Sequence, residues 1–185
     1  MTVNLRYSMQ LKKHPLHLFQ FCPKCGSDKF VENNFKSKHC ESCDFTYYFN
    51  SSSATVAVII NDLNEILVAT RANDPAKGTL DLPGGFVDMN ESGEDAVMRE
   101  VKEETGLDVK SVQYLFSIPN LYVYSGFEVE TTDLFFLCKV DNGKTFTAYD
   151  DVSELRFIPV SDLDSSLFGL RSIKEGVERI KRLTL

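Results

Sequence analysis

Hydrophobic and polar residues change their spacing along the chain, and these changes predict the order of its elements. Residues 54–60 (ATVAVII) form a β-branched apolar run, which is typical of a central strand. A polar turn at 61–64 follows, and residues 65–71 (EILVATR) predict the second strand of a hairpin. Two later strands are expected, one at 109–117 and a longer one within 127–140.

A charged stretch with helical signals follows a Pro-Gly-Gly turn at 83–85. The helix is expected to begin near Asn90 or Ser92, because either side chain can accept a backbone hydrogen bond at an N-cap. Gly106 stands where a C-cap glycine belongs, so the helix is expected to end just before it.

Apolar residues mark the faces that this helix and a later one would bury. Val97 and Val101 form an i, i+4 pair that can face a core. Residues 51–53 are three serines and predict a short linker. Cys138 lies inside an apolar run and is expected to be a buried core thiol. A final helix, capped by serines and aspartates at 161–166, is predicted from residues at helical spacing: Leu167, Leu170, Ile173, Val177 and Ile180.

Three carboxylates crowd one face of the first predicted helix. Glu100, Glu103 and Glu104 fall within an arc of about 100° on a helical wheel. Like charges at these spacings destabilise a helix by a few tenths of a kcal/mol per pair. A hard divalent cation would offset this cost, because Mg²⁺ and Mn²⁺ prefer carboxylate and water oxygens. The alternative is a solvated acidic helix face that binds nothing.

Four cysteines predict a metal site in the first fifty residues. Cys22 and Cys25 form one CxxC pair, and Cys40 and Cys43 form another after an interval of fourteen residues. Two such pairs are typical of a structural Zn²⁺ site, because each bends two thiolates onto one tetrahedral ion. Two disulfides, or iron in a rubredoxin-like site, are the alternatives.

Aromatic residues surround these cysteines, with rough alternation in FQF and FTYYF. The pattern indicates a small β-ribbon whose core is too thin to fold without its metal. Its lysines give only a modest positive face, so a structural or dimerisation role is favoured over nucleic-acid binding. Four cysteines complete a tetrahedral shell, so the nearby histidines are interpreted as bystanders: His14, His17 and His39.

Composition narrows the functional classes. A chain of 185 residues with 43% hydrophobic and 25% charged residues can form one good domain and a small appendage. The net charge of −7 argues against broad electrostatic binding to DNA or RNA, which needs a basic surface. The sequence has no apolar run long enough to span a membrane and no signal-peptide pattern at its start, so a cytoplasmic protein is expected.

One spacing pattern carries a resemblance. Counted from Gly85, five residues lead to Glu91, and seven more lead to the segment 99–107, REVKEETGL. This is G-x5-E-x7-R-E-U-x-E-E-x-G-U, where U is aliphatic, with every defined position filled. The chain resembles the Nudix hydrolases. The resemblance implies an α+β fold, a Nudix α/β/α sandwich with a mixed β-sheet over 51–185, preceded by a small β zinc ribbon over 1–50.

The resemblance also implies roles for individual residues. The Mg²⁺ or Mn²⁺ ligands would be the carbonyl of Gly85 and the carboxylates of Glu100, Glu103 and Glu104, one of which would act as general base. Glu91 and Arg99 would form a structural ion pair that orients these catalytic glutamates. A fourth acidic ligand is expected outside the signature, and the candidates are Asp151 and its rivals Glu128, Glu130 and Asp133.

A cysteine ribbon before such a domain is similar to the NADH pyrophosphatase-type subfamily. Its S-Q-P-W-P-F-P-x-S motif is reduced here to SIPNLYVYS at 117–125. Tyr122 and Tyr124 are candidates to stack on a base, with ordinary strand aromatics as the alternative. Arg71 is a candidate for a phosphate contact or a structural ion pair, and Glu128 is a candidate substrate contact.

The resemblance implies metal-dependent hydrolysis of the pyrophosphate bond in a nucleoside diphosphate linked to another moiety, such as NADH, ADP-ribose or a nucleotide sugar. The alternatives are removal of an NAD cap or a 5′-diphosphate from RNA, and a non-catalytic nucleotide sensor or interaction module. A small-molecule substrate and a homodimer are expected.

Overall fold

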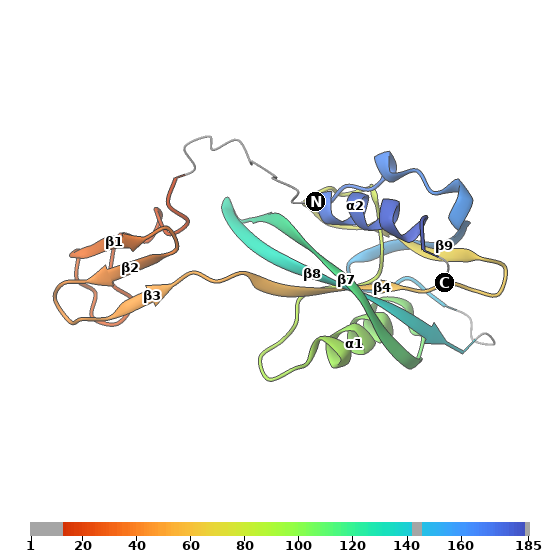
Figure 1. The fold of residues 1–185 in the computed structure, drawn as a ribbon, viewed down its shortest axis with the longest axis horizontal. Helices are drawn as coiled ribbons and strands as arrows, with labels where there is room; N and C mark the ends of the chain where they lie inside the picture. The colour runs from red at the N-terminus through yellow and green to blue at the C-terminus, as the bar shows by residue number, and fades with distance from the viewer. Residues whose placement is uncertain (1–12, 142–145, 184–185) are drawn as a thin grey trace, which may run out of the picture. The chain divides into compact units, whose positions relative to one another are not determined.

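The computed structural model describes residues 13–141 and 146–183 of the chain (Figure 1). The chain folds into two compact units, Met1–Asn50 and Ser51–Leu185. Each unit has its own hydrophobic core. Among the described residues, no helix is both long and apolar enough to cross a membrane.

The first unit contains a three-stranded antiparallel sheet in the order β1-β2-β3, formed by Phe30–Asn34, Ser37–Cys40 and Thr46–Tyr48. Its core is small, with Cys22, Phe30 and Cys40 buried together. Most of the aromatic residues lie outside it, and Phe35 is 81% exposed. A core of this size cannot supply much hydrophobic stabilisation, as the sequence pattern predicted.

The first sheet of the second unit is mixed, as expected. Strand β4 (Ser52–Val58) runs parallel to β8 (Phe127–Val140), and β8 pairs with β7 (Val109–Tyr124) in antiparallel register. The prediction of a linker at 51–53 is wrong in part, because β4 begins at Ser52, which pairs with Thr131. Strand β7 is also longer than predicted, because pairing with β8 extends it to Tyr124.

The second sheet is antiparallel, with β5 (Glu65–Arg71) between β6 (Leu80–Asp81) and β9 (Val152–Pro159). The predicted hairpin of β4 and β5 is present only at its turn, where Ile60 and Ile66 form an isolated bridge. Beyond that bridge the two strands separate into different sheets.

Helix α1 spans Gly93–Thr105, and both of its predicted caps are confirmed. The side chain of Ser92 accepts a hydrogen bond from the backbone N–H of Asp95. Gly106 adopts the left-handed conformation with φ of 73°, and its N–H donates to the carbonyl of Lys102. Of the two predicted cap residues, Ser92 is therefore the one that acts.

Two 3₁₀ turns, Val160–Asp162 and Ser165–Leu167, precede helix α2 (Arg171–Ile180). The prediction that Leu167 belongs to the apolar face of this helix is wrong, because Leu167 lies in the preceding turn and is 53% exposed. The remaining apolar residues of the predicted face are buried or half-buried: Leu170, Ile173, Val177 and Ile180.

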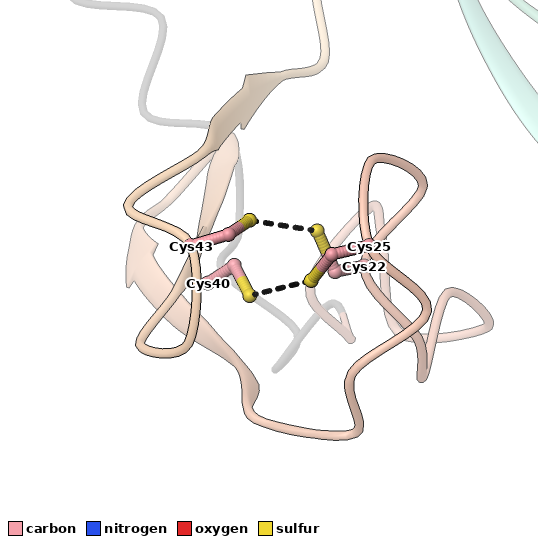
Figure 2. Close-up of side chains that lie close together, drawn as sticks. All are labelled: Cys22, Cys25, Cys40 and Cys43. Atoms are coloured by element: carbon pink, nitrogen blue, oxygen red, sulfur yellow. Dashed lines mark hydrogen bonds between the residues drawn. The ribbon is translucent and has the colours of Figure 1, made fainter.

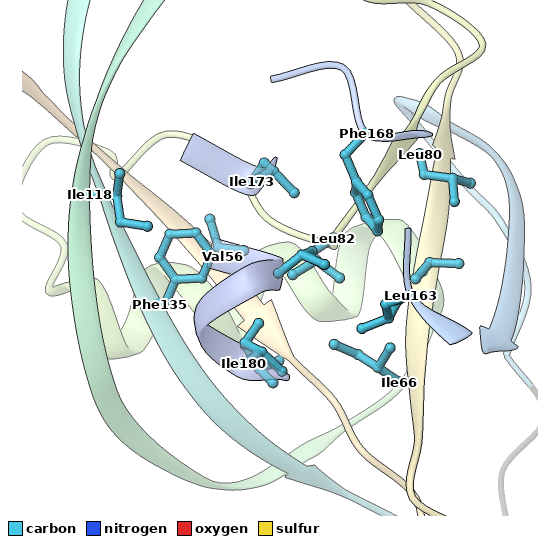
Figure 3. Packing of buried hydrophobic residues seen from close by; sticks show 13 residues of the cluster. Val56, Ile66, Leu80, Leu82, Ile118, Phe135, Leu163, Phe168, Ile173 and Ile180 are labelled. Carbon is cyan, nitrogen blue, oxygen red and sulfur yellow. The ribbon is translucent and has the colours of Figure 1, made fainter. Parts of the chain in front are cut away.

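The two helices cover opposite faces of the mixed sheet, as Figure 1 shows for β4 between α1 and α2. Val56 and Val58 pack in a cluster with α2 residues, seen in Figure 3, whereas Ala57 and Ile59 pack with Val97 and Val101 of α1. Alternation along one strand therefore supplies both layers of the core. The result is the expected α/β/α sandwich.

Candidate active site and metal centres

A cleft of about 360 Å³ opens at the edge of the mixed sheet in the second unit. It is lined by the glycine turn after β6, by one face of α1, and by inward-facing residues of β7 and β8. Acidic groups dominate its polar lining: Asp81, Asp88, Glu100, Glu103, Glu104, Asp133, Asp150 and Asp151. A cavity with this composition suits cations or polyphosphate–cation complexes better than free anions.

Arg99 organises the carboxylates at the α1 side of the cleft. Its Nε and Nη2 donate to the two carboxylate oxygens of Glu91 at 2.8 and 2.9 Å. Its Nη1 donates to Glu100 at 2.8 Å and to Glu103 at 3.0 Å, and Nη2 also donates to the carbonyl of Phe86. One guanidinium thus fixes two of the three signature glutamates relative to the turn.

The same network shifts the titration of its members. The hydrogen bonds from Arg99 hold the pKa of Glu91 at about 2. In return, the hydrogen bonds to Glu91 outweigh desolvation and raise the pKa of Arg99. The pair is therefore fully ionised at neutral pH, and the orientation that it imposes does not depend on pH in that range.

The glycine turn brings backbone close to the carboxylates. Gly84 has φ of 149°, and a Cβ there would collide with the carbonyl oxygen of Thr55, so only glycine fits. A Cβ at Gly85 would lie 2.5 Å from Oε1 of Glu100. The carbonyl of Gly85 accepts from the backbone N–H of Thr55 at 2.7 Å and from the Thr55 hydroxyl at the longer distance of 3.4 Å.

Glu104 is the most buried of the three glutamates, with 7% exposed. Its Oε2 accepts the backbone N–H of Gly84 at 2.9 Å. Burial nevertheless dominates and raises its pKa to about 8, with the charges of Glu100, Asp81 and Asp151 acting in the same direction. Burial also raises the pKa of Glu100, against the opposing effect of Arg99. For both acids burial disfavours the charged form, and a nearby positive charge would favour it.

Comparison with known proteins agrees with this geometry. The family model for the NUDIX domain matches residues 51–179. The chain belongs to the Nudix family. It is 34% identical over 139 residues to an ADP-ribose pyrophosphatase of Methanocaldococcus jannaschii, covering 74% of this chain and 79% of the relative.

Other Nudix proteins extend the comparison. The chain is 29% identical over 150 residues to the NAD-capped RNA hydrolase NudC of Vibrio parahaemolyticus, covering 81% of this chain and 55% of the relative. It thus spans about half the length of that relative. The fold is similar to the crystal structure of a NUDIX hydrolase from Nitrosomonas europaea, with a TM-score of 0.69 at 20% identity, covering 88% of this chain and 90% of the other.

The Nudix glutamates line one cleft, but their oxygens do not all converge. Within residues 13–141 and 146–183, only the four cysteines form a group of at least three Cys, His, Asp or Glu side chains whose ligand atoms all lie within 4.8 Å of one another. Arg99 holds Glu100 and Glu103, whereas Glu104 is held by Gly84. The donor set still has the chemistry of a Mg²⁺ or Mn²⁺ site, since all of its members are oxygens.

The four candidates for a fourth acidic ligand differ in whether they line the cleft. Asp151 lines the cleft, adds to the negative charge around Glu104, and accepts a hydrogen bond from Asn73 at 2.6 Å. Asp133 also lines the cleft, but Thr131 and Ser172 already donate to its two oxygens. The lining of the cleft does not include Glu128 or Glu130.

The candidate substrate residues also differ in whether they line the cleft. Arg71 lines the cleft, forms an ion pair with the buried Asp81, and donates to the hydroxyl of Tyr122 at 3.2 Å. Tyr122 lines the cleft and meets Phe86 edge to face at 5.8 Å. Tyr124 and Glu128 lie near the tip of the β7–β8 hairpin, and the lining of the cleft includes neither of them.

Several residues of the cleft were not identified from the sequence. Asp81, Asn120 and Thr131 are buried polar residues that line it. Asn120 and Thr131 are paired partners on β7 and β8. Polar residues that face inward on a strand could have indicated this part of the cleft. Which residues face inward is known only once the register of the two strands is known.

The first unit holds a second candidate metal centre, shown in Figure 2. The Sγ atoms of Cys22 and Cys43 are 3.7 Å apart, as are those of Cys25 and Cys40. Four sulfurs at a Zn–S distance of about 2.3 Å form a tetrahedron with edges of about 3.8 Å. All five cysteines of the chain are free thiols, so the structure contains no disulfide between the four cysteines of this group.

Equivalent backbone turns build the two halves of this centre. The N–H of Gly26 donates to the carbonyl of Cys22, and the N–H of Asp44 donates to the carbonyl of Cys40. Both Gly26 and Asp44 have positive φ. Cys138, by contrast, is 1% exposed in the second unit, and burial raises its pKa to about 12. The prediction of a buried core thiol is confirmed.

Proposed function

We propose that the Nudix domain hydrolyses the pyrophosphate bond of a nucleoside diphosphate linked to another moiety, with NADH and ADP-ribose as the leading substrates and Mg²⁺ or Mn²⁺ as the cofactor. One observation carries this proposal. The three signature glutamates, Glu100, Glu103 and Glu104, line a single cleft beside the backbone of Gly85. Relatives that share this domain are named ADP-ribose pyrophosphatase and NAD-capped RNA hydrolase.

The residues present fit a divalent cation. Glu100, Glu103, Glu104 and the carbonyl of Gly85 would hold it, with Asp151 as a further ligand from the lining of the cleft. A bound cation would neutralise pyrophosphate charge and lower the pKa of a bound water. Without a positive charge, burial keeps the pKa of Glu104 at about 8, so this acid is poorly ionised at neutral pH.

The protein's own groups supply positioning and proton transfer. Arg99 and Glu91 orient Glu100 and Glu103 and touch no substrate atoms in this scheme. Burial raises the pKa of Glu100 above its usual value, which makes it a stronger base for the proton of the attacking water. The buried and hydrogen-bonded walls of the cleft keep these groups fixed during the reaction.

A second substrate class is NAD-capped RNA. The relatives named NAD-capped RNA hydrolase favour it. Such a substrate presents the same pyrophosphate to the cleft, with an RNA chain in place of a small leaving group. The chemistry of the site is the same in both cases, and only the length of the ligand differs.

We also propose that Cys22, Cys25, Cys40 and Cys43 hold a structural Zn²⁺. The support is the closeness of their sulfurs, with two pairs at 3.7 Å and all four within 4.8 Å of one another, and the small core around them. A metal–ligand shell would provide the folding energy that so few buried side chains cannot.

A substrate panel tests the proposal. The full chain is incubated with Mg²⁺ and, separately, NADH, ADP-ribose, nucleotide sugars and an NAD-capped RNA, and the products are identified by mass spectrometry. Release of two phosphate-bearing products from at least one compound is expected. Binding without hydrolysis across the panel would instead indicate a nucleotide sensor.

A further inference from the structure

Asn120 differs from the other buried polar residues of the cleft. It is 2% exposed, lies on the inward face of β7, and lines the cleft. Its side-chain amide makes no hydrogen bond to any residue in the described part of the chain. No fully buried side-chain nitrogen or oxygen among those residues lacks a partner. The amide of Asn120 must therefore reach the open space of the cleft.

The polar neighbours of Asn120 form hydrogen bonds with one another and not with its side-chain amide. Thr131, its register partner on β8, donates to Asp133 at 2.7 Å, and Ser172 of α2 donates to the same carboxylate. Asp81 is paired with Arg71. An amide left without a partner at such a buried site costs free energy unless water or a ligand completes it.

The position of Asn120 relative to the glycine turn suits a nucleoside that extends from a diphosphate bound at the turn. Strand β8 lies beside β7, and β4 lies beside β8. On its other side, β4 bonds to the turn through Thr55 N–H and the carbonyl of Gly85. Three strand spacings, roughly 14 Å, therefore separate the backbone of Asn120 from the turn across the strands. Thr55 also lies three residues further along β4 than Ser52, the partner of Thr131, which adds roughly 10 Å along the strand. A diphosphate beside Gly85 would place its sugar and base along this floor.

We propose that Asn120 binds the base of the substrate, pairing its amide with an edge that carries an NH₂ donor next to an acceptor. This inference rests on the proposed function, because it takes the ligand to be a nucleotide. Two bases of a nicotinamide–adenine dinucleotide offer this edge: adenine through N6 and its adjacent ring nitrogen, and nicotinamide through its carboxamide. Asn120 is thus a specificity-determining residue.

The chemistry of the surroundings favours an amino group over a carbonyl at this place. A carboxamide side chain offers one acceptor and two donors, and it pairs with adenine through two parallel hydrogen bonds in other complexes. The carboxylates of Asp81 and Asp133 line the same cleft, and their charge favours an NH₂ donor over an oxygen at the position of the amino group. A base whose amino group is replaced by oxygen therefore loses a donor and meets repulsion.

Binding of mononucleotides tests this inference without requiring hydrolysis. AMP, IMP and nicotinamide mononucleotide contain no pyrophosphate bond, so they are titrated by calorimetry into the full-chain protein with Mg²⁺. Asn120→Ala is compared with wild type and with Gln113→Ala, which removes an exposed side-chain amide from the same strand. We expect Asn120→Ala to weaken one of the two amino-bearing ligands about tenfold, the scale of one or two lost hydrogen bonds. Gln113→Ala is expected to match wild type.

Comparison of the ligands identifies which base, adenine or nicotinamide, binds to Asn120. Selective weakening of AMP, with a smaller preference of the variant for AMP over IMP, assigns the site to adenine. Selective weakening of nicotinamide mononucleotide assigns it to nicotinamide. Equal affinities of wild type and Asn120→Ala for both ligands would overturn the inference, and so would failure of the wild type to bind either.

Two further measurements keep the result interpretable. Thermal unfolding of each variant checks the fold, and Asn120→Thr, which suits a strand, replaces the alanine variant if that variant unfolds. The wild-type protein could bind mononucleotides in a way that depends on Asn120 and yet hydrolyse no dinucleotide. That result would overturn the proposed reaction and leave this inference standing.

Discussion

Gly85 and Glu100 lie so close that a Cβ on residue 85 would be 2.5 Å from Oε1 of the glutamate and 2.7 Å from its Cδ. This contact joins the turn after β6 to helix α1 at the proposed metal site. The glycine at this position is therefore needed to leave space for a carboxylate. It does not serve a special backbone conformation, in contrast to Gly84, whose φ is 149°.

Gly85→Ala is expected to fold and to lose activity. The added methyl group meets a side chain that can rotate away, so the fold survives while Glu100 leaves its position. A displacement of about 1 Å at a catalytic group commonly costs about 100-fold in rate. Steady-state kinetics and thermal unfolding of the same sample measure the two effects. Wild-type kcat in Gly85→Ala would contradict the proposed role of Glu100.

Gly84→Ala provides the contrast to that substitution. Here the new Cβ meets backbone, the carbonyl of Thr55, and no side chain can move to relieve it. This variant is expected to unfold at a lower temperature than Gly85→Ala. The reverse order would show that the turn is more plastic than its packing indicates.

Glu103→Gln is expected to lower kcat by about 100-fold or more, the scale seen when a group that stabilises developing charge is removed. The substitution keeps the shape of the side chain and removes the charge that would face the cation. Glu94→Gln is the matched control, because Glu94 lies on the same helix, is exposed, and does not line the cleft. Activity of Glu103→Gln equal to that of the control would exclude Glu103 as a metal ligand.

The raised pKa of Glu104 predicts a pH-dependent stability when Mg²⁺ and Mn²⁺ are absent. Its pKa rises from 4.5 to about 8 on folding, so the folded state holds a proton that the unfolded state releases. The contribution of this group to stability therefore falls as the pH rises from 4.5 to 8.

Glu104→Gln should remove that dependence. The variant is expected to match wild type near pH 5 and to be more stable at pH 8, by on the order of a few kcal/mol. Urea unfolding at the two pH values, without added Mg²⁺ or Mn²⁺, measures the difference. A gap of the same size at both pH values would show that Glu104 ionises normally in the folded protein.

Local signals were sufficient to predict the parts of the fold that depend on neighbouring residues. The caps of α1 at Ser92 and Gly106 are encoded within one turn of the helix, and the bounds of β5 follow from an apolar run between polar turns. The extension of β7 to Tyr124 was missed, because a partner strand that follows a turn at Ser125 and Gly126 stabilises it. Pairing of this kind is not visible in the periodicity of one strand alone.

The residues of the candidate site also differ in whether local sequence could predict them. The spacing of the signature identified Glu100, Glu103 and Glu104, because one helix carries all three. Asn120 and Asp81 come from different sheets, and only the fold brings them to one cleft. Tyr124 was proposed beside Tyr122, but the lining of the cleft includes only the latter.

Removal of zinc is expected to unfold the first unit and to leave the Nudix domain folded, because the clusters of the Nudix domain contain only its own residues. Limited proteolysis after treatment with a zinc chelator should cleave within residues 13–50, while hydrolysis is partly retained. Light scattering before and after treatment shows whether the ribbon supports a dimer. Resistance of this segment to proteolysis after complete zinc loss would contradict a structural role for the metal.

Substitution of single cysteines separates zinc binding from core packing. Cys25→Ser should abolish stoichiometric zinc, measured by metal analysis of the purified protein, because three thiolates leave the tetrahedral shell open. Cys138→Ala is the control, since Cys138 is buried in the core of the other unit and does not belong to the cysteine cluster. It should keep its zinc and lose only stability. Zinc loss in the control would mean that the metal lies elsewhere.

Tyr122 and Tyr124 form a matched pair on one strand, and only the first is expected to affect catalysis. Tyr122 meets the ring of Phe86 at 5.8 Å and accepts a hydrogen bond from Arg71, so its removal reshapes the wall of the cleft. Tyr122→Ala should raise KM roughly three- to tenfold, the scale of an aromatic contact. Tyr124 is 66% exposed, and Tyr124→Ala should match wild type. An equal rise in KM for both variants would show that the substrate reaches the hairpin tip, which would place its recognition outside the cleft.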